Sequence, residues 1–192
     1  MRPKIIIDVD GVLSNTHLPW LNLYNAEWDD NLQIKDITKW EMHELVKPEC
    51  GKLIYEYLKD PILYQQSPII HGAKEGVEFL KEFGEVYFVT SGLFTSKFEW
   101  LYDFGFIPDN DDWRFINNII VTSDKSMISG DVIIDDYAKN LIGDRKLKLL
   151  FDRPWNQRPV AHDVTRVHGW DEITKIISWG PAWEEILRNL PT

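Results

Sequence analysis

The sequence opens with a short apolar run. After residue 70, further short apolar runs alternate with amphipathic stretches. The first run, residues 3–9, contains three consecutive isoleucines, so both faces of the expected strand are apolar. This pattern is typical of a strand that is covered on both sides in a parallel sheet. Later apolar runs predict strands at residues 85–90, 118–121, 131–135 and 147–151, and a short one at 165–167.

Helical periodicity occupies the stretches between these strands. Residues 72–83 place Ala73, Val77 and Leu80 on one face, and Gly84 follows as a helix-ending glycine. The alternation of strands and helices predicts an α/β fold with a Rossmann-like parallel sheet flanked by helices. Further helices are expected at residues 95–104, 170–178 and 181–190.

The stretch after the first strand breaks this alternation, because it has helical character and little strand signal. Helices are expected to open at Pro19 and to span residues 48–59, and a capping-box pattern from Thr38 to Glu41 predicts a short helix between them. Because this stretch follows the first strand directly, we expect it to be an inserted helical cap. The predicted domains are a core of residues 1–13 and 71–192 and a cap of residues 14–70, which folds over the strand's end.

Two carboxylates, Asp8 and Asp10, end the first apolar run, and Gly11 follows them. In open α/β sheets, ligands bind beyond the carboxyl ends of the strands. Two anions this close repel each other unless a hard cation or a shared proton holds them. A calcium loop would need an oxygen ligand and a glycine where Val12 and Leu13 stand, so that pattern fails. A simple turn carboxylate is the structural alternative.

Three further strand ends carry polar groups. Thr90 and Ser91 offer hydroxyls that suit phosphate oxygens, although a Ser-Gly pair after a strand is often only a turn. Lys125 suits an anion, or is a surface lysine paired with its neighbour. The acidic pair Asp135 and Asp136 ends a second buried apolar run, as Asp8 and Asp10 end the first. A helix cap would explain one of these two aspartates but not both.

Together these residues predict a phosphoryl-transfer site. Asp8 would attack phosphorus and form an aspartyl-phosphate, and Asp10 would protonate the leaving oxygen and then activate water. Mg²⁺ held by the two acidic pairs, and Lys125 beside it, would neutralise charge on the phosphate.

The composition limits which kinds of binding partner and compartment we expect. The net charge of −10 argues against a nucleic-acid polymer as the partner but leaves a small phosphorylated substrate open. Cys50 is the only cysteine, which suits a cytoplasmic protein without disulfides, and no apolar run is long enough to span a membrane. The five histidines show no metal-ligand spacing, so we expect them to be structural or surface residues.

The ordered motifs resemble those of the haloacid-dehalogenase superfamily of phosphatases, and more narrowly the 5′(3′)-deoxyribonucleotidase family. The similarity covers most of the chain and is weakest across residues 14–68. Its segments are Asp8 to Leu13, Thr122 to Ser126, Val132 to Asp136, Leu149 to Gln157 and Val167 to Ile173.

The resemblance implies that Asp8 is the nucleophile and Asp10 the acid and base. It implies that Mg²⁺ binds the Asp8 carboxylate, the Asp10 backbone carbonyl and Asp136, with Asp135 as a supporting partner.

The resemblance also implies the substrate contacts. The phosphate would be held by Thr90, Ser91 and Lys125. The cap aromatics would contact the base, with Trp40 the best candidate and Trp20 and Tyr24 behind it, unless these side chains only pack the cap.

Two departures from the family concern the substrate. Relatives can carry a basic residue soon after the Thr-Ser pair, whereas this region is Leu93-Phe94 here. Relatives also carry an aromatic residue soon after the first motif, whereas the matching position here falls near Thr16. The expected enzyme is a nucleoside monophosphate phosphatase. The alternatives are a phosphatase of another small phosphate such as a phosphosugar, phosphotransfer to another acceptor, and a nucleotide-binding module without turnover. The sequence leaves open whether the chain forms a homodimer.

Overall fold

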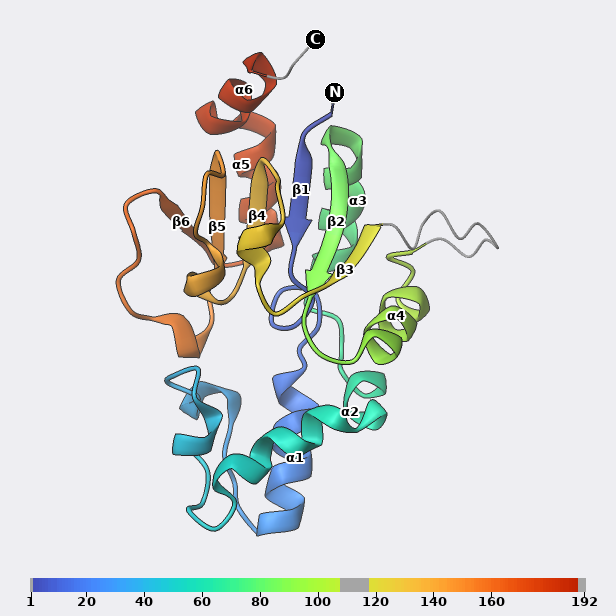
Figure 1. The fold of residues 1–192 in the computed structure, drawn as a ribbon, viewed down its shortest axis with the longest axis vertical. Helices are drawn as coiled ribbons and strands as arrows, with labels where there is room; N and C mark the ends of the chain where they lie inside the picture. The colour runs from blue at the N-terminus through green and yellow to red at the C-terminus, as the bar shows by residue number, and fades with distance from the viewer. Residues whose placement is uncertain (1, 108–117, 190–192) are drawn as a thin grey trace.

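The structure, a computed structural model, describes residues 2–107 and 118–189. Six parallel strands form one sheet in the order β3-β2-β1-β4-β5-β6, with β1 between β2 and β4 (Figure 1). This confirms the predicted α/β fold. The strands are β1 (Lys4–Ile7), β2 (Glu85–Thr90), β3 (Ile119–Val121), β4 (Val132–Asp135), β5 (Leu147–Phe151) and β6 (Val164–Val167).

Helices account for most of the remaining regular structure. The α-helices are α1 (His17–Trp28), α2 (Pro61–Gln65), α3 (Ala73–Phe83), α4 (Phe94–Asp103), α5 (Trp170–Trp179) and α6 (Pro181–Arg188). The 3₁₀-helices are η1 (Ile34–Asp36), η2 (Met42–Glu44), η3 (Gly51–Lys59), η5 (Lys125–Met127), η6 (Ala138–Asn140) and η7 (Pro154–Asn156).

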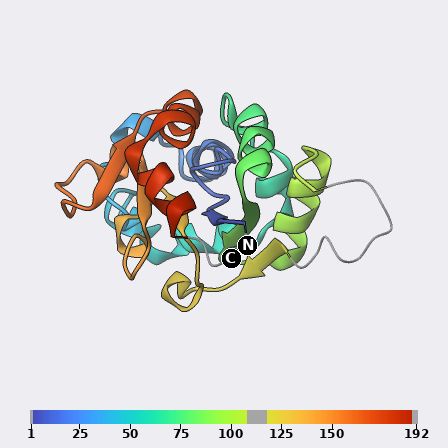
Figure 2. The ribbon, with the colours of Figure 1, turned by 90° about the horizontal axis from the view of Figure 1, so that it is seen from above.

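The isoleucines of β1 are buried on both faces of the sheet, as the unbroken apolar run predicts. Ile5 and Ile7 belong to the larger apolar cluster, which includes the buried faces of α3 and α5. Ile6 points to the opposite face and packs with Ile133 and Leu150 in a smaller cluster. Helices α3 and α5 lie side by side on one face of the sheet, as the view from above shows (Figure 2). Strand β1 is therefore covered on both faces and has a neighbouring strand on each side.

Two glycines allow close packing around this centre. A Cβ atom at Gly76 would lie 2.3 Å from the Trp170 ring, so the missing side chain lets α3 approach α5. Gly84 ends α3 as predicted, but its φ of −152° is extended rather than left-handed. A Cβ atom there would lie 2.7 Å from the Pro3 carbonyl oxygen, so close backbone contact, not helix-cap geometry, requires glycine at this position.

Residues 14–70, here called the helical segment, contain α1, α2 and η1 to η3 and no strand of the sheet. The segment lies beyond the carboxyl ends of the strands, in the lower part of Figure 1. It has its own apolar cluster, which includes Trp20, Tyr24 and Ile54. A bridge between Ser14 and Ile69 brings its two ends together next to β1.

Several local predictions differ from the structure. Helix α1 begins at His17, two residues before Pro19, and residues 51–59 form a 3₁₀-helix rather than an α-helix. The capping box at Thr38 is wrong, because the short helix begins only at Met42. Its first residue, Met42, packs in the cluster of the helical segment. Leu190, within the range expected for the last helix, lies outside the described residues.

No helix within the described ranges combines the length and the apolar character that a membrane crossing requires.

Candidate active site

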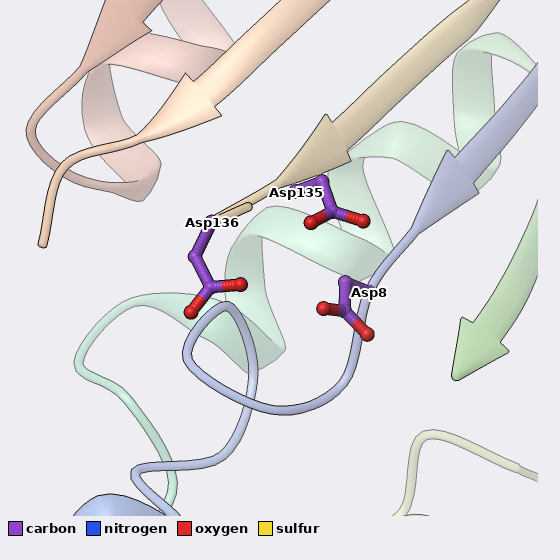
Figure 3. Close-up of side chains that lie close together, drawn as sticks. All are labelled: Asp8, Asp135 and Asp136. Atoms are coloured by element: carbon purple, nitrogen blue, oxygen red, sulfur yellow. The ribbon is translucent and has the colours of Figure 1, made fainter. Parts of the chain in front are cut away.

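The strand order places the site at the centre of the sheet. The chain runs from β1 to β2 on one side and returns to β4 on the other, so the strand order reverses beside β1. Ligands of open α/β sheets bind at such a switch point. Asp8 follows β1, and Asp135 ends the neighbouring β4. Figure 3 shows that the carboxylates of Asp8, Asp135 and Asp136 gather at these two strand ends.

These three carboxylates form the acidic cluster of the site. One oxygen of each lies within 4.8 Å of the others, and all three side chains are buried. Burial is the main cause that raises the pKa of Asp8 to about 7, and the charges of Asp135 and Asp10 add to it. The pKa of Asp136 is also well above its usual range, because of burial first and then the charges of Asp8 and Asp135. A cation would relieve this repulsion.

Lys125 lies between two of these carboxylates. Its Nζ is 2.9 Å from Asp8 Oδ1 and 2.7 Å from Asp135 Oδ2, and its side chain is buried. Burial alone would lower the pKa of Lys125, but the two carboxylates outweigh burial and raise it. The guanidinium of Arg145 donates to the Lys125 carbonyl oxygen over 2.7 Å and so holds the backbone of this turn. The alternative of a surface lysine is therefore wrong, because Lys125 is buried and its ion pairs are with Asp8 and Asp135.

Asp135 and Asp136 have different surroundings. Both oxygens of Asp135 accept hydrogen bonds from the protein: Oδ1 from the Tyr137 N–H at 2.8 Å, and both from the Asn140 amide at 3.1 Å. Asp136 Oδ2 accepts from the Trp155 indole over 3.0 Å. Its Oδ1 is buried and has no hydrogen-bond partner among the described residues. Asp136 therefore has a free oxygen for a ligand, whereas Asp135 mainly anchors Lys125 and the following turn.

Asp10 is held from two elements that flank the site. Thr16 Oγ1, just before α1, donates to Asp10 Oδ1 over 2.6 Å, and the Lys97 ammonium, on α4, bonds Asp10 Oδ2. Burial would raise the pKa of Asp10, but the Lys97 charge and the hydrogen bonds from both residues lower it below the usual value. Lys97 is fully buried, and its Nζ lies 4.2 Å from the centre of the Tyr64 ring.

The role of Lys97 was missed in the sequence. It stands in an ordinary amphipathic helix among other polar residues, and only the orientation of α4 turns it toward Asp10. A lysine on the apolar side of that helix is the one signal that could have been used, since a buried lysine requires a partner.

The predicted phosphate-binding residues lie at the end of β2. Thr90 is buried, and its carbonyl accepts from the Thr122 N–H over 2.9 Å. Ser91 is exposed and lines the cavity above the acidic cluster, as does Gly92, whose φ of +93° favours glycine. The structure brings Ser91, Asp8 and Lys125 together around this one cavity.

This cavity, of about 560 Å³, lies between the sheet edge and the helical segment. The sheet side contributes Asp8, Asp10 and Lys125, and the helical segment contributes aromatic side chains that include Trp20, Trp40 and Tyr55. It therefore joins a charged floor to an aromatic wall, the combination that suits a phosphate ester with a flat, apolar group.

The three aromatic candidates of the helical segment are placed differently. Trp40 is 41% exposed, lines the cavity and stacks on Tyr137, with ring centres 4.0 Å apart. Trp20 also lines the cavity, but its indole N–H donates to the Ile54 carbonyl over 2.8 Å, which ties it to the fold. Tyr24 is fully buried in the cluster of the helical segment and does not line the cavity.

His17 lies in the cavity wall, although the sequence indicated only a structural or surface role. Its ring stacks on Trp155, with ring centres 4.0 Å apart. Burial lowers the pKa of His17 to about 4, despite the nearby Asp10 carboxylate, so the ring is neutral at pH 7. A single histidine without a spacing pattern carries no signal of this placement in the sequence.

Comparison with known proteins identifies the relatives of this chain. The sequence profile of the family described as 5′ nucleotidase, deoxy (pyrimidine), cytosolic type C protein matches residues 2–180. A 5′(3′)-deoxyribonucleotidase of Clostridium acetobutylicum is 31% identical over 175 residues, covering 89% of this chain and 92% of that protein. One from Bacillus subtilis is 30% identical over 181 residues, covering 91% of this chain and 98% of that protein.

Solved structures with the same fold are more distant in sequence. A haloacid dehalogenase-like hydrolase from Streptococcus pneumoniae superposes with a TM-score of 0.62 at 14% identity, covering 92% of this chain and 98% of that one. A haloacid-dehalogenase hydrolase from Bacillus subtilis, crystallised with magnesium, gives a TM-score of 0.58 at 16% identity, covering 93% and 99%. At these identities the likeness establishes a haloacid-dehalogenase-like fold.

Proposed function

The chain belongs to the family of deoxy (pyrimidine), cytosolic type C 5′ nucleotidases, and we propose that it is a Mg²⁺-dependent phosphatase of nucleoside monophosphates, with deoxyribonucleotides as the preferred substrates. One observation carries the proposal. At the switch point of the sheet, Asp8 and Lys125 line a cavity with aromatic walls, and Asp8 clusters there with Asp136, which has a buried oxygen without a partner among the described residues. The relatives named above support the choice of substrate.

The acidic cluster fits a divalent metal ion. Carboxylate and carbonyl oxygens are the ligands that Mg²⁺ prefers, and an unpartnered buried carboxylate oxygen needs a cation or a proton. Asp8 and Asp136 would hold the ion with the Asp10 backbone carbonyl, and Asp135 would support them through Lys125. The bound ion would keep Asp8 ionised at neutral pH and offset the negative charge of the phosphate oxygens.

Asp8 would act as the nucleophile. Its carboxylate attacks phosphorus and forms an aspartyl-phosphate while the bond to the ester oxygen breaks. Lys125, 2.9 Å from Asp8 Oδ1, would balance charge that develops on the phosphate. Thr90 and Ser91, at the end of the neighbouring β2, would hold the remaining phosphate oxygens through hydroxyl and backbone N–H groups.

Asp10 would transfer the protons. It gives a proton to the leaving ester oxygen in the first step, which departs as a hydroxyl. In the second step it takes a proton from the attacking water, which releases inorganic phosphate and restores Asp8. Before substrate binds, the Lys97 charge keeps Asp10 ionised. A dianionic phosphate near Asp10 would raise its pKa, so Asp10 would take up from solvent the proton that the first step requires.

The helical segment would act as a cap. We propose that residues 14–70 form this cap and that residues 1–13 and 71–192 form the core domain. The cap covers the cavity, excludes water and presents Trp40 to the nucleobase. Trp40 stacks on Tyr137, so the base would pack against one of these two rings.

The test is phosphate release from a panel of nucleoside 5′- and 3′-monophosphates and sugar phosphates, with Mg²⁺ and with EDTA. Asp8→Asn is compared with Asp171→Asn, which changes an exposed carboxylate at the start of α5. We expect deoxyribonucleotides to be hydrolysed best, EDTA and Asp8→Asn to abolish release, and Asp171→Asn to behave as the parent.

Two outcomes would contradict the proposal. If sugar phosphates are the best substrates, the phosphatase chemistry stands and the nucleotide assignment is wrong. If no compound is turned over, and Asp8→Asn binds nucleotides as the parent does, the protein is a binding module rather than an enzyme.

A further inference from the structure

Two residues from different segments of the chain, Trp155 and Gly11, enclose Asp136 Oδ2. The Trp155 indole N–H donates to it over 3.0 Å. On the other side lies Gly11, with a φ of +75°, where a Cβ atom would be 2.1 Å from Oδ2 and 2.7 Å from Asp136 Cγ. Because Oδ2 is enclosed in this way, the Asp136 carboxylate can offer only its other oxygen, Oδ1, to a ligand.

The chain around Trp155 is fixed to the same region. Asn156 Nδ2 donates to the Asp136 carbonyl over 2.7 Å and to the Phe151 carbonyl over 2.8 Å. Arg153 Nε donates to the Gly11 carbonyl over 2.6 Å. The loop after β5 therefore binds the backbone of Asp136 and of the loop after β1, and it holds both in place for the indole contact.

Trp155 also belongs to the helical segment's apolar cluster, although it comes from the other side of the cavity. Its ring is 6% exposed and stacks on His17 of α1 at an interplanar angle of 23°. Burial and the His17 stack limit the rotation of the indole, so the N–H keeps pointing at Asp136. A less confined side chain would not hold one carboxylate rotamer.

We propose that Trp155 is a positioning residue for metal binding: its indole N–H occupies Asp136 Oδ2, so that the carboxylate is held with Oδ1 turned to the divalent cation. The inference rests on the metal site of the proposed function. Hydrogen-bonding partners of this kind orient metal ligands in many proteins, and losing one typically weakens metal affinity about 10–100-fold.

The test compares Trp155→Phe with Trp100→Phe. Phenylalanine keeps an aromatic ring in this position but removes the N–H that reaches Asp136, together with part of the buried ring volume. Trp100 is a matched control, because its buried indole N–H donates to the Ser67 carbonyl over 2.8 Å and not to a carboxylate of the acidic cluster. The readouts are Mg²⁺ affinity by calorimetry, the rise in melting temperature on adding Mg²⁺, and the Mg²⁺ dependence of turnover.

We expect Trp155→Phe to bind Mg²⁺ about 10–100-fold more weakly, and to recover most of its kcat at saturating Mg²⁺. Trp100→Phe should bind Mg²⁺ as the parent does, whatever its own melting temperature. Equal Mg²⁺ affinity in the parent and Trp155→Phe, or an equal loss in both variants, would overturn the inference alone. Absence of Mg²⁺ binding by the parent would overturn the metal site itself and this inference with it.

Discussion

The Lys97 ammonium bonds directly to the Asp10 carboxylate, although the two residues stand 87 positions apart in the sequence. Lys97 comes from α4, which follows β2, and Asp10 comes from the loop after β1. Because β1 and β2 are neighbours in the sheet, the elements that follow them meet above its edge. The contact gives the proposed acid and base a fixed orientation and an ionised resting state.

Replacing Lys97 with methionine should lower both activity and stability. The variant leaves the partly buried Asp10 with Thr16 as its remaining bonded partner, so burial raises the pKa of Asp10. We expect kcat to fall at least tenfold and the free energy of unfolding to drop by about 1–3 kcal/mol. Steady-state kinetics and urea unfolding measure the two effects. Lys175→Met, at an exposed ion pair on α5, is the control, and equal effects in both variants would contradict the assignment.

Replacing Asp8 with asparagine should stabilise the metal-free protein at high pH while it abolishes turnover. The pKa of Asp8 is about 7 when folded, so between about pH 4 and 7 the folded parent holds a proton that the unfolded chain has lost. The parent's stability therefore declines as the pH rises through this range, and Asp8→Asn removes that contribution. Melting temperatures in EDTA should favour the variant at pH 8, and the difference should shrink as the pH falls towards 4. A variant that is less stable than the parent at pH 8 would show that Asp8 is not under strain.

Mg²⁺ binding should strengthen as the pH rises from 6 to 8. The ion binds ionised Asp8, and the metal-free protein still holds a proton there at pH 6 because burial has raised the pKa to about 7. Binding at pH 6 therefore releases protons, and the release diminishes above pH 7. Calorimetry in buffers of different ionisation enthalpy measures the protons released. A pH-independent affinity would mean that Asp8 does not contact the ion.

Trp40→Ala should weaken nucleotide binding with little effect on the phosphate chemistry. Stacking of a base on an aromatic side chain is worth roughly 1–3 kcal/mol, so KM for a deoxynucleotide should rise about tenfold. KM for a small sugar phosphate should stay unchanged, because it offers no flat ring. Trp179→Ala, at an 85% exposed tryptophan on α5, is the control. An equal rise in KM for both kinds of substrate would assign Trp40 to packing of the helical segment.

The sequence by itself determined the frame of the site. The isoleucine run of β1 fixes a strand buried on both faces, and Asp8 must then emerge at its carboxyl end. The same reasoning places Asp135 and Asp136 at the end of β4. These features depend on local pattern and on the rule that parallel strands align their carboxyl ends, so they can be predicted without knowing how the helices pack.

Only the tertiary structure decided what surrounds those carboxylates. Lys97 and His17 reach the site because of the angles at which α4 and α1 pack, and no local pattern encodes such angles. Trp155 meets Asp136 through a loop after β5. The capping-box pattern at Thr38 is likewise not realised: the short helix begins at Met42, which is buried in the cluster of the helical segment. Long-range packing energies exceed local propensities, and they therefore choose the side chains that complete the site.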